Sequence, residues 1–452
     1  QTLCIRRAGD SKVEAARQQL SEALKSVDDA EVLAEVIRAL SNFNDLSVSG
    51  ELIGFLDHED ATVVAWAMRA LVASGDKKIR DTLIDKVKNS QCMSNPTADC
   101  DLATALAVEN IAAFQDDVSL DFLIGNIHNP NPMFRRTVIT SLASMGEKTM
   151  PALTKTLESG DKDEKIMAAN IVGLMGDKQG ADILLAQMEK ADDLNLRFAI
   201  YEALGRIMSM RSVIGLSDGL AENDEMVLTA VITGLNNLFN PGVMKVLMEV
   251  LDKRDDQSDR VLKTIVTARA RDIFMAVYRQ GEHANALIEK ILASGKESAA
   301  YFTSIVAASE AATADDDIAR LEGAEESTAT RSILAADDSK AMLFFYKGAA
   351  NDLGSNVITA KDGSDALDYI NCGNMIDLLI TDMNMPKMDG IALTREVRKK
   401  SELADLPILM ASTESEQQQK ELARKVGVTD FITKPFSSEQ LREKIEEMIG
   451  KG

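Results

Sequence analysis

The stretch that decides the fold of the last quarter of this chain is "LLITDMNMPKMDG", residues 378–390. An apolar run ends abruptly at Asp382, and a second acid, Asp389, and a glycine, Gly390, follow within eight residues. A buried strand that stops on an acid places a carboxylate where the core meets solvent. Because burying a carboxylate is costly unless it has partners, Asp382 is the first candidate for a functional group.

Short apolar runs alternate with longer amphipathic segments on both sides of this stretch. The apolar runs, which we predict to be strands, lie at 332–336, 356–360, 377–381, 407–411 and 430–434. The segments predicted to be helices lie at 341–354, 363–373, 391–400, 415–427 and 437–449. Strands that alternate with helices indicate a parallel sheet covered on both faces, so we expect a doubly wound α/β domain over 331–452.

Polar side chains gather where these strands end. Ligands of such sheets bind outside the carboxyl ends of the strands, where the sequence has Asp337, Asp338, Asp382, Ser412 and Lys434. Three carboxylates brought together repel one another, so a cation is expected to hold them ionised, and hard oxygen ligands suit Mg²⁺. A lysine and a hydroxyl beside such an ion suit phosphoryl chemistry, with Asp382 as the nucleophile that forms an aspartyl-phosphate.

These residues also fit a known family. "AADDS", "LLITDMNMPKMDG", "ILMAST" and "FITKPF" resemble, in this order, the motifs of the receiver domain of bacterial response regulators, a flavodoxin-like fold. The resemblance covers about 331–450. It implies that Asp382 is the phosphoacceptor and that Mg²⁺ is held by Asp337, Asp338, Asp382 and the backbone carbonyl of Asn384. It also implies that Ser412 and Phe431 are switch residues and that Lys434 is the conserved-type lysine, followed by Pro435 in a cis bond. Asp389 and Gly390 would shape the turn.

Two positions bear on how long a phosphoryl group would last. Thr413 follows Ser412 where the family usually has Ala or Gly, and its bulk is expected to slow phosphorylation and hydrolysis. Asn384 and Glu414 occupy positions that tune dephosphorylation in the family, and both are polar.

The first three hundred residues contain a repeat. Seven segments align, from "RALSNFND" ending at Asp45 to "TGLNNLFN" ending at Asn240. Their apolar anchors are Leu40, Leu71, Ile111, Leu142, Val172, Leu204 and Leu235, which are 31, 40, 31, 30, 32 and 31 residues apart. The one long interval holds "NSQCMSNPTADC", which we interpret as an inserted loop.

Each unit has a helix of about a dozen residues, a polar turn and a second helix. A helix pair of this length cannot bury its own apolar face, so neighbouring units must stack into a solenoid. The pattern resembles short HEAT repeats, and we place an all-α HEAT-like domain at 15–310. The acids at the turns are expected to cap helices.

The repeat region shows no catalytic pattern. His58, His128 and His283 lie in separate turn-like contexts and are expected at the surface or at helix ends. A curved solenoid surface suggests binding to an unknown protein partner, an inference from fold class alone. The acidic segment 311–330 is predicted to be a linker with one helical turn near Ile318–Leu321.

Composition limits the partners. The net charge of −22 argues against nucleic acid, because binding to phosphates requires an excess of Lys and Arg. No apolar run approaches the roughly 18–20 residues of a membrane span, and no signal peptide is visible, so a cytoplasmic location is expected. Cys92 and Cys100 could pair in an oxidising compartment, but free thiols are the favoured interpretation.

The favoured function is two-component signal transduction without enzymatic turnover of a substrate. A histidine kinase or phosphotransfer protein would phosphorylate Asp382, and the face near Phe431, with the helix at 415–427, would change its contact with the solenoid or another protein. A phosphorylation-dependent dimer is a further expectation.

Three alternatives stay open. A haloacid-dehalogenase-type phosphatase uses similar groups, but there the nucleophilic strand comes first, and Asn384 stands where its acid–base Asp belongs. A constitutive HEAT scaffold with a degenerate receiver is the second alternative. The third is a bilin lyase built on helical repeats.

Overall fold

The structure, a computed structural model, describes residues 2–43, 49–95, 98, 100–323, 331–351, 353–412 and 417–450, with backbone only at 417–419. Contacts between Cα atoms divide the chain into two units, Gln1–Ala152 and Leu153–Gly452. The two units are described separately below.

The described part of the first unit is helical. Its helices are α1 Thr2–Ser11, α2 Glu14–Ala23, α3 Ala30–Ser41, α4 Ser49–Gly54, α5 Ala61–Ala73, α6 Lys77–Lys88, α7 Gln91–Ser94, α8 Leu102–Ala113, α9 Asp117–Ile124 and α10 Pro132–Ser144. Helix α7 lies in the stretch that we expected to be an inserted loop, so this insertion contains a short helix. Helices α3, α5, α8 and α10 contact one another in succession, as stacked repeats require.

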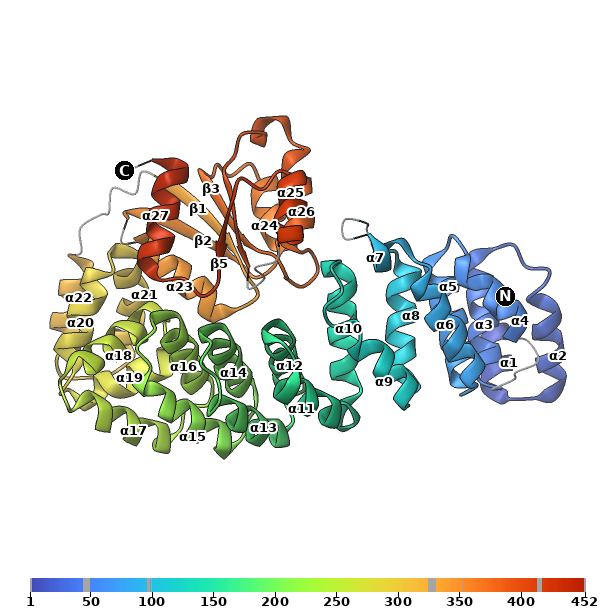
Figure 1. The fold of residues 1–452 in the computed structure, drawn as a ribbon, viewed down its shortest axis with the longest axis horizontal. Coiled ribbons are helices and arrows are strands. Elements are labelled where there is room, and N and C mark those ends of the chain that lie inside the picture. The colour runs from blue at the N-terminus through green and yellow to red at the C-terminus, as the bar shows by residue number, and fades with distance from the viewer. Residues whose placement is uncertain are drawn as a thin grey trace. The chain divides into compact units, whose positions relative to one another are not determined.

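The second unit continues the helical repeats and adds a sheet (Figure 1). Its repeat helices are α11 Met150–Ser159, which spans the division, α12 Lys162–Met175, α13 Lys178–Met188, α14 Leu194–Arg206, α15 Met210–Asp218, α16 Glu225–Asn237, α17 Pro241–Leu251, α18 Asp256–Thr267, α19 Arg271–Gln280, α20 Ala284–Ala293, α21 Lys296–Ala307 and α22 Ala314–Glu322. Successive contacts join α12, α14, α16, α18 and α20.

The seven apolar anchors define the cores of both sets of repeats. Each anchor lies in the first helix of its pair, and each is at most 2% exposed: Leu40, Leu71, Ile111, Leu142, Val172, Leu204 and Leu235. The helices α14 and α16 approach so closely that a Cβ added to Gly205 would lie 2.7 Å from the Cα of Gly234. The small residues near the anchors therefore set the spacing between helices.

Acids at the turns begin the helices. Asp161 accepts a hydrogen bond from the backbone N–H of Glu164, whose side chain accepts one from the backbone of Asp161, a complete capping box at α12. A single N-cap aspartate that accepts from a backbone N–H, without the reciprocal bond, begins α3, α5, α6, α8, α13, α14 and α16. The expected capping role of these acids agrees with the structure.

The acidic segment 311–330 is more structured than we expected. Instead of one turn it holds the nine-residue helix α22, which contacts α21. Leu321 is buried, and the Tyr278 hydroxyl donates a 2.7 Å hydrogen bond to Asp317. The composition of this segment did not predict the helix, because few of its residues are large and apolar. Residues 324–330 lie outside the described residues.

The sheet has five parallel strands in the order β2-β1-β3-β4-β5. The strands are β1 Arg331–Ala336, β2 Ser355–Ala360, β3 Leu378–Asp382, β4 Ile408–Ser412 and β5 Asp430–Thr433. Each one overlaps a predicted strand. Every residue of β3 and β4 is buried, as expected for central strands of a sheet covered on both faces.

Helices cover both faces of the sheet (Figure 1). They are α23 Lys340–Asn351, α24 Gly363–Asn371, α25 Gly390–Arg398, α26 Gln417–Lys425 and α27 Ser438–Ile449. Helices α23 and α27 contact each other, and so do α24 and α25. The doubly wound α/β architecture is confirmed, following an all-α repeat region.

No helix among the described residues is long and apolar enough to cross a membrane.

Candidate functional site

The parallel strands bring the predicted residues together at one edge of the sheet. Asp337 follows β1, Asp382 ends β3, Ser412 ends β4, and Lys434 follows β5. These four residues are at most 7% exposed. The Lys434 ammonium lies 2.8 Å from the Oδ2 atom of Asp337 and 2.8 Å from the Oδ1 atom of Asp382. The lysine therefore bridges two carboxylates from different strands.

Burial and charge oppose each other at this bridge. Burial alone would lower the pKa of Lys434, but the Asp337 and Asp382 carboxylates raise it well above its ordinary value. Burial raises the pKa of Asp337, and the charge of Lys434 opposes this rise. Asp337 also accepts hydrogen bonds from the Tyr346 hydroxyl at 3.0 Å and from the backbone N–H of Ser339 at 2.9 Å.

Asp338 lies next to this bridge in different surroundings. Its side chain is exposed, whereas Asp337 is buried. The pKa of Asp338 is raised, first by desolvation from the protein around it and then by repulsion from Asp337, Asp382 and Glu202. Because the side chain still reaches solvent, a cation could approach it and relieve this repulsion.

Two residues of the repeats complete the surroundings of the site, and sequence analysis did not identify either. Glu202 of α14 accepts a 2.5 Å hydrogen bond from the Ser339 hydroxyl. The Asn195 side chain, also from α14, donates to the backbone carbonyl of Lys434. These pairs are 137 and 239 residues apart in the chain, and nothing in the repeat pattern distinguishes these two polar residues. Only the fold brings them to the site.

The turn after β3 holds the phosphoacceptor candidate in place. The backbone N–H of Asn384 donates a 2.7 Å hydrogen bond to the Oδ2 atom of Asp382. Asp389 caps α25 by accepting from the backbone N–H of Ala392 at 2.7 Å. A Cβ added to Gly390 would lie 2.2 Å from the carbonyl oxygen of Asp382, so only glycine fits there.

The predicted switch residues lie near this edge. Ser412 is buried, and the half-buried ring of Phe431 packs against the core cluster on the α24–α25 face of the sheet. The guanidinium of Arg424 lies 5.9 Å from the centre of the Phe431 ring. Pro435 follows a cis peptide bond, as the resemblance implied. Thr413 and Glu414 lie outside the described residues.

The chemistry of the acids fits Mg²⁺, although their present spacing does not. Carboxylate and carbonyl oxygens are the ligands that Mg²⁺ takes in proteins. Among the described residues, however, the three acids Asp337, Asp338 and Asp382 do not all offer oxygens within 4.8 Å of one another. Lys434 lies between two of them, so these side chains would need to rearrange to share an ion.

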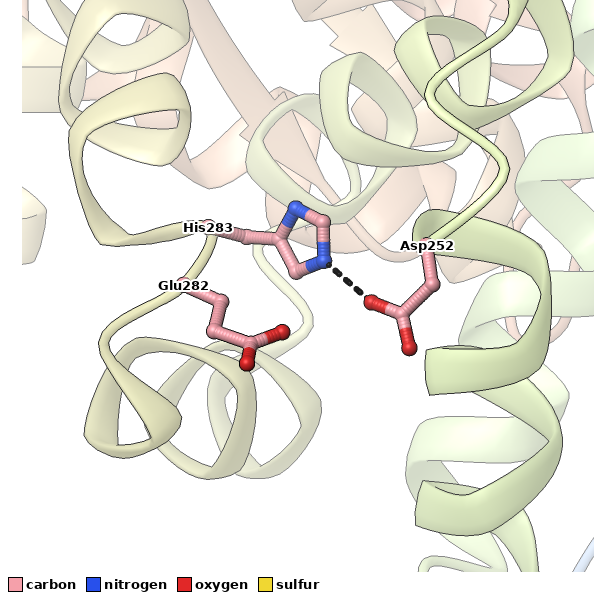
Figure 2. Close-up of side chains that lie close together, drawn as sticks. All are labelled: Asp252, Glu282 and His283. Atoms are coloured by element: carbon pink, nitrogen blue, oxygen red, sulfur yellow. Dashed lines mark hydrogen bonds and ion pairs between the residues drawn. The ribbon is translucent and has the colours of Figure 1, made fainter.

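A different group does meet that spacing. The ligand atoms of Asp252, Glu282 and His283 lie within 4.8 Å of one another (Figure 2). His283 is 5% exposed, so it is not a surface histidine, but it lies at the start of α20, which is the other position expected for it. Its Nε2 atom lies 3.0 Å from Asp252, and this bond joins the end of α17 to the start of α20. Both acids are exposed, and we interpret the group as a structural link between turns.

The first unit holds a cysteine pair. The Sγ atoms of Cys92 and Cys100 are 3.0 Å apart, and both residues are free thiols. The hydrogen bond between the two thiols lowers the pKa of Cys92 to about 7 and raises the pKa of Cys100.

Comparison with known proteins agrees with the geometry. A family model described as "Response regulator receiver domain" matches residues 333–446, and one described as "HEAT repeats" matches residues 150–236. The chain is 37% identical over 121 residues to a chemotaxis protein CheY homolog of Campylobacter jejuni, covering 93% of that protein and 26% of this chain. It is 42% identical over 118 residues to the chemotaxis protein CheY of Pseudomonas aeruginosa, covering 94% of that protein and 26% of this chain.

These matches favour a phosphoacceptor domain over the phosphatase that shares its groups. The two relatives match over nearly their whole length, and the family model spans every motif that suggested the resemblance. The chain belongs to the response regulator family, with a C-terminal receiver domain of two-component signalling joined to HEAT repeats.

Proposed function

We propose that Mg²⁺-dependent phosphorylation of Asp382 changes the contact between the receiver and its own repeat helices, and thereby changes how the repeats bind a protein partner. The observation that carries this proposal is the direct hydrogen bonding of α14 to the two loops that flank the site. Glu202 bonds to Ser339, two residues after Asp337, and Asn195 bonds to Lys434 itself.

The phosphoryl step requires a donor, such as the phosphohistidine of a kinase or phosphotransfer protein. An oxygen of Asp382 attacks phosphorus, the P–N bond of the donor breaks, and the leaving imidazole takes up a proton. Mg²⁺, held by Asp337, Asp338, Asp382 and the carbonyl of Asn384, would neutralise charge on the transferred group. Lys434 would pair with the phosphoryl oxygens, and Ser412 would donate a hydrogen bond to them.

This step would alter the surroundings of α14. Lys434 now divides its charge between Asp337 and Asp382, and a phosphoryl group would draw it away from Asp337. Because the Asn195 side chain of α14 donates to the backbone carbonyl of Lys434, movement of this loop would directly strain or break a contact of α14. The switch requires only that the two receiver states differ in their affinity for the repeats.

The receiver face involved differs from the one that we predicted. We expected the surface near Phe431 and α26 to contact the solenoid. The described contacts run instead through α23, which packs against α16 and α18, and through Ser438, which bonds to Glu225. The face near Phe431 is then available for a separate partner or for the predicted dimer.

The test is intact mass after incubation with acetyl phosphate, with and without Mg²⁺. We expect a single phosphoryl adduct that requires Mg²⁺ and is lost in Asp382→Asn, whereas Asp377→Asn, five residues earlier in the chain and just before β3, retains it. No adduct in the unmodified chain with either acetyl phosphate or a cognate kinase would overturn the phosphoacceptor assignment and favour a constitutive scaffold.

A further inference from the structure

A cavity of about 280 Å³ lies between the receiver and the repeats, away from the phosphoacceptor site. Its walls come from α16, α18, α20 and α21 of the repeats and from α23 and the first residue of α27 of the receiver. Small-molecule sites typically measure about 300–1,000 Å³ and often lie between domains. The cavity is slightly smaller than the lower end of this range.

The charge of this cavity is opposite to that of the whole chain. The protein carries 72 acidic and 50 basic residues. Among the charged residues that line the cavity, only Glu225 is acidic, and the basic ones are Arg260, Lys263, Arg269, Lys290 and Lys347. A concentration of positive charge within a low-dielectric wall attracts anions.

The acidic partners of these bases do not balance them. Lys263 pairs with Glu225 at 3.3 Å, and Lys290 pairs with Asp259 at 2.5 Å. Arg269 and Lys347 share one acid, Glu297. Three carboxylates thus serve five cations, which leaves two positive charges uncompensated by these pairs.

Arg260 is one source of this excess. Its guanidinium donates to the side-chain oxygens of Gln257 at 2.7 Å and of Asn223 at 3.1 Å, both of which are neutral. Among the described residues no carboxylate forms an ion pair with it. Arginine can donate two parallel hydrogen bonds to a phosphate or a carboxylate, so Arg260 offers a specific anion contact.

Lys347 is the other source. Its side chain is 13% exposed, and desolvation lowers its pKa even though Glu297 opposes this effect. The ammonium shares its carboxylate with Arg269. A further anion beside it would favour its charged form.

Other wall residues suit the rest of a small organic ligand. Phe344 and Phe345 of α23 give an aromatic wall, and Leu228 of α16 adds an aliphatic side chain. Hydroxyl side chains also line the cavity: Thr264, Thr267, Ser294, Ser298 and Ser438. Four of them, Thr264, Thr267, Ser294 and Ser438, already donate hydrogen bonds to protein oxygens. Apolar walls with a few polar groups that fix orientation are typical of ligand sites.

We propose that this cavity binds a small aromatic or aliphatic organic phosphate, with its anionic group on Arg260 and Lys347 and its apolar part against Phe344 and Phe345. Such a ligand would contact helices of both the repeats and the receiver, and would therefore stabilise their docked arrangement. The site requires neither phosphorylation of Asp382 nor Mg²⁺.

The experiment is isothermal titration calorimetry of the full chain with phenyl phosphate, in buffer that contains EDTA so that the receiver site cannot take the probe through Mg²⁺. Inorganic phosphate tests the anion without the ring, and benzyl alcohol tests the ring without the charge. Arg260→Gln and Lys347→Gln remove the two proposed anion contacts, and Arg211→Gln, which changes an exposed arginine outside this cavity, is the matched control.

We expect phenyl phosphate to bind with one site per chain and more tightly than either inorganic phosphate or benzyl alcohol. Loss of a charged hydrogen bond should weaken binding by about tenfold or more in Arg260→Gln and in Lys347→Gln. Binding should be unchanged in Arg211→Gln and in Asp382→Asn. The proposal is overturned if phenyl phosphate does not bind, if either simpler probe binds as tightly, or if Arg260→Gln and Arg211→Gln behave alike.

Discussion

At the scale of single residues, the Lys434 ammonium contacts two buried carboxylates, one on each side. Replacing it with Gln would leave Asp337 and Asp382 facing each other without a cation. Removing one partner of a buried ion pair typically costs about 3–5 kcal/mol. We therefore predict that Lys434→Gln lowers the free energy of unfolding of the receiver by roughly this amount, measured by hydrogen exchange of β3 amides in the full chain.

Lys444→Gln is the control for this prediction. Lys444 pairs with Asp430 and Glu447 at a solvent-accessible position, so its removal should cost no more than about 1 kcal/mol. Equal effects of the two substitutions would contradict the special role given to Lys434.

A second prediction at the scale of single residues concerns the backbone at Gly390. Because a Cβ there would lie 2.2 Å from the carbonyl oxygen of Asp382, Gly390→Ala must displace the turn that positions Asp382, the proposed phosphoacceptor. We expect a loss of about 2 kcal/mol in receiver stability and slower phosphorylation by acetyl phosphate, measured by intact mass over time.

Gly54→Ala provides the comparison, because a Cβ on this helical glycine meets nothing within 4 Å. There the change should be neutral or stabilising, by up to about 1 kcal/mol. Normal phosphorylation kinetics in Gly390→Ala would contradict the close approach.

Sequence alone predicted much of the site at this scale, because strand ends in a parallel sheet converge at one edge. Asp337, Asp382, Ser412 and Lys434 could be identified from their places after apolar runs. Asn195 and Glu202 could not, because their roles depend on how a distant domain docks. Tyr346 was likewise missed, since a helical tyrosine gives no sign that its hydroxyl reaches Asp337.

At the scale of helices and strands, the repeat helices depend on caps at their first turns. Asp161 and Glu164 form a reciprocal pair at the start of α12. We predict that Asp161→Ala lowers the stability of α12 by about 1 kcal/mol, since the backbone N–H of Glu164 would lose its partner. Hydrogen exchange of the α12 amides measures this change.

Glu158→Ala, an exposed substitution in the preceding helix α11, is the control and should leave α12 within about 0.5 kcal/mol. Equal protection of α12 in Asp161→Ala and the unmodified chain would argue against the capping role.

The cysteine pair near α7 gives another prediction at this scale. The 3.0 Å separation of the Cys92 and Cys100 Sγ atoms brings two thiols within reach of each other, and the pKa of Cys92 near 7 favours its thiolate. We expect diamide to remove two hydrogens from the chain by joining these residues, measured by intact mass and peptide mapping.

Cys92→Ser should abolish the linked peptide, whereas Cys372→Ser, at an exposed cysteine of the receiver, should not. A diamide product that links other cysteines, or none, would contradict this prediction.

Periodicity predicted most helices and strands because each repeat and each strand carries its own apolar pattern. It failed for α22, where one buried leucine and a hydrogen bond to Tyr278 hold an acidic segment in place. It also failed for α7, which is only four residues long. Short elements that depend on tertiary contacts have too few apolar residues to show a period.

At the scale of the whole molecule, the unit Leu153–Gly452 contains both repeat helices and the receiver. The described contacts that join them include α23 against α16 and α18, and the pairs Glu202 with Ser339, Asn195 with Lys434, Lys347 with Glu297 and Ser438 with Glu225. Domain limits at 310 and 331, the cytoplasmic location and the dimer stay predictions, and so does the identity of the protein partner.

These contacts are the proposed route by which the receiver acts on the repeats. Direct contact makes this coupling testable within the chain, without knowledge of any partner. A phosphoryl mimic at Asp382 should weaken the docking of α14 and α23 because it competes for Lys434 and displaces the loop that Asn195 holds.

The most direct measurement is hydrogen exchange of the full chain with and without beryllofluoride and Mg²⁺, with Asp382→Asn as the control. Protection of the turn at 384–390 will show that the mimic has bound. We predict faster exchange in α14 and α23 of the unmodified chain and no change in Asp382→Asn. Protection of the turn with unchanged exchange in α14 and α23 would contradict coupling between the receiver and the repeats.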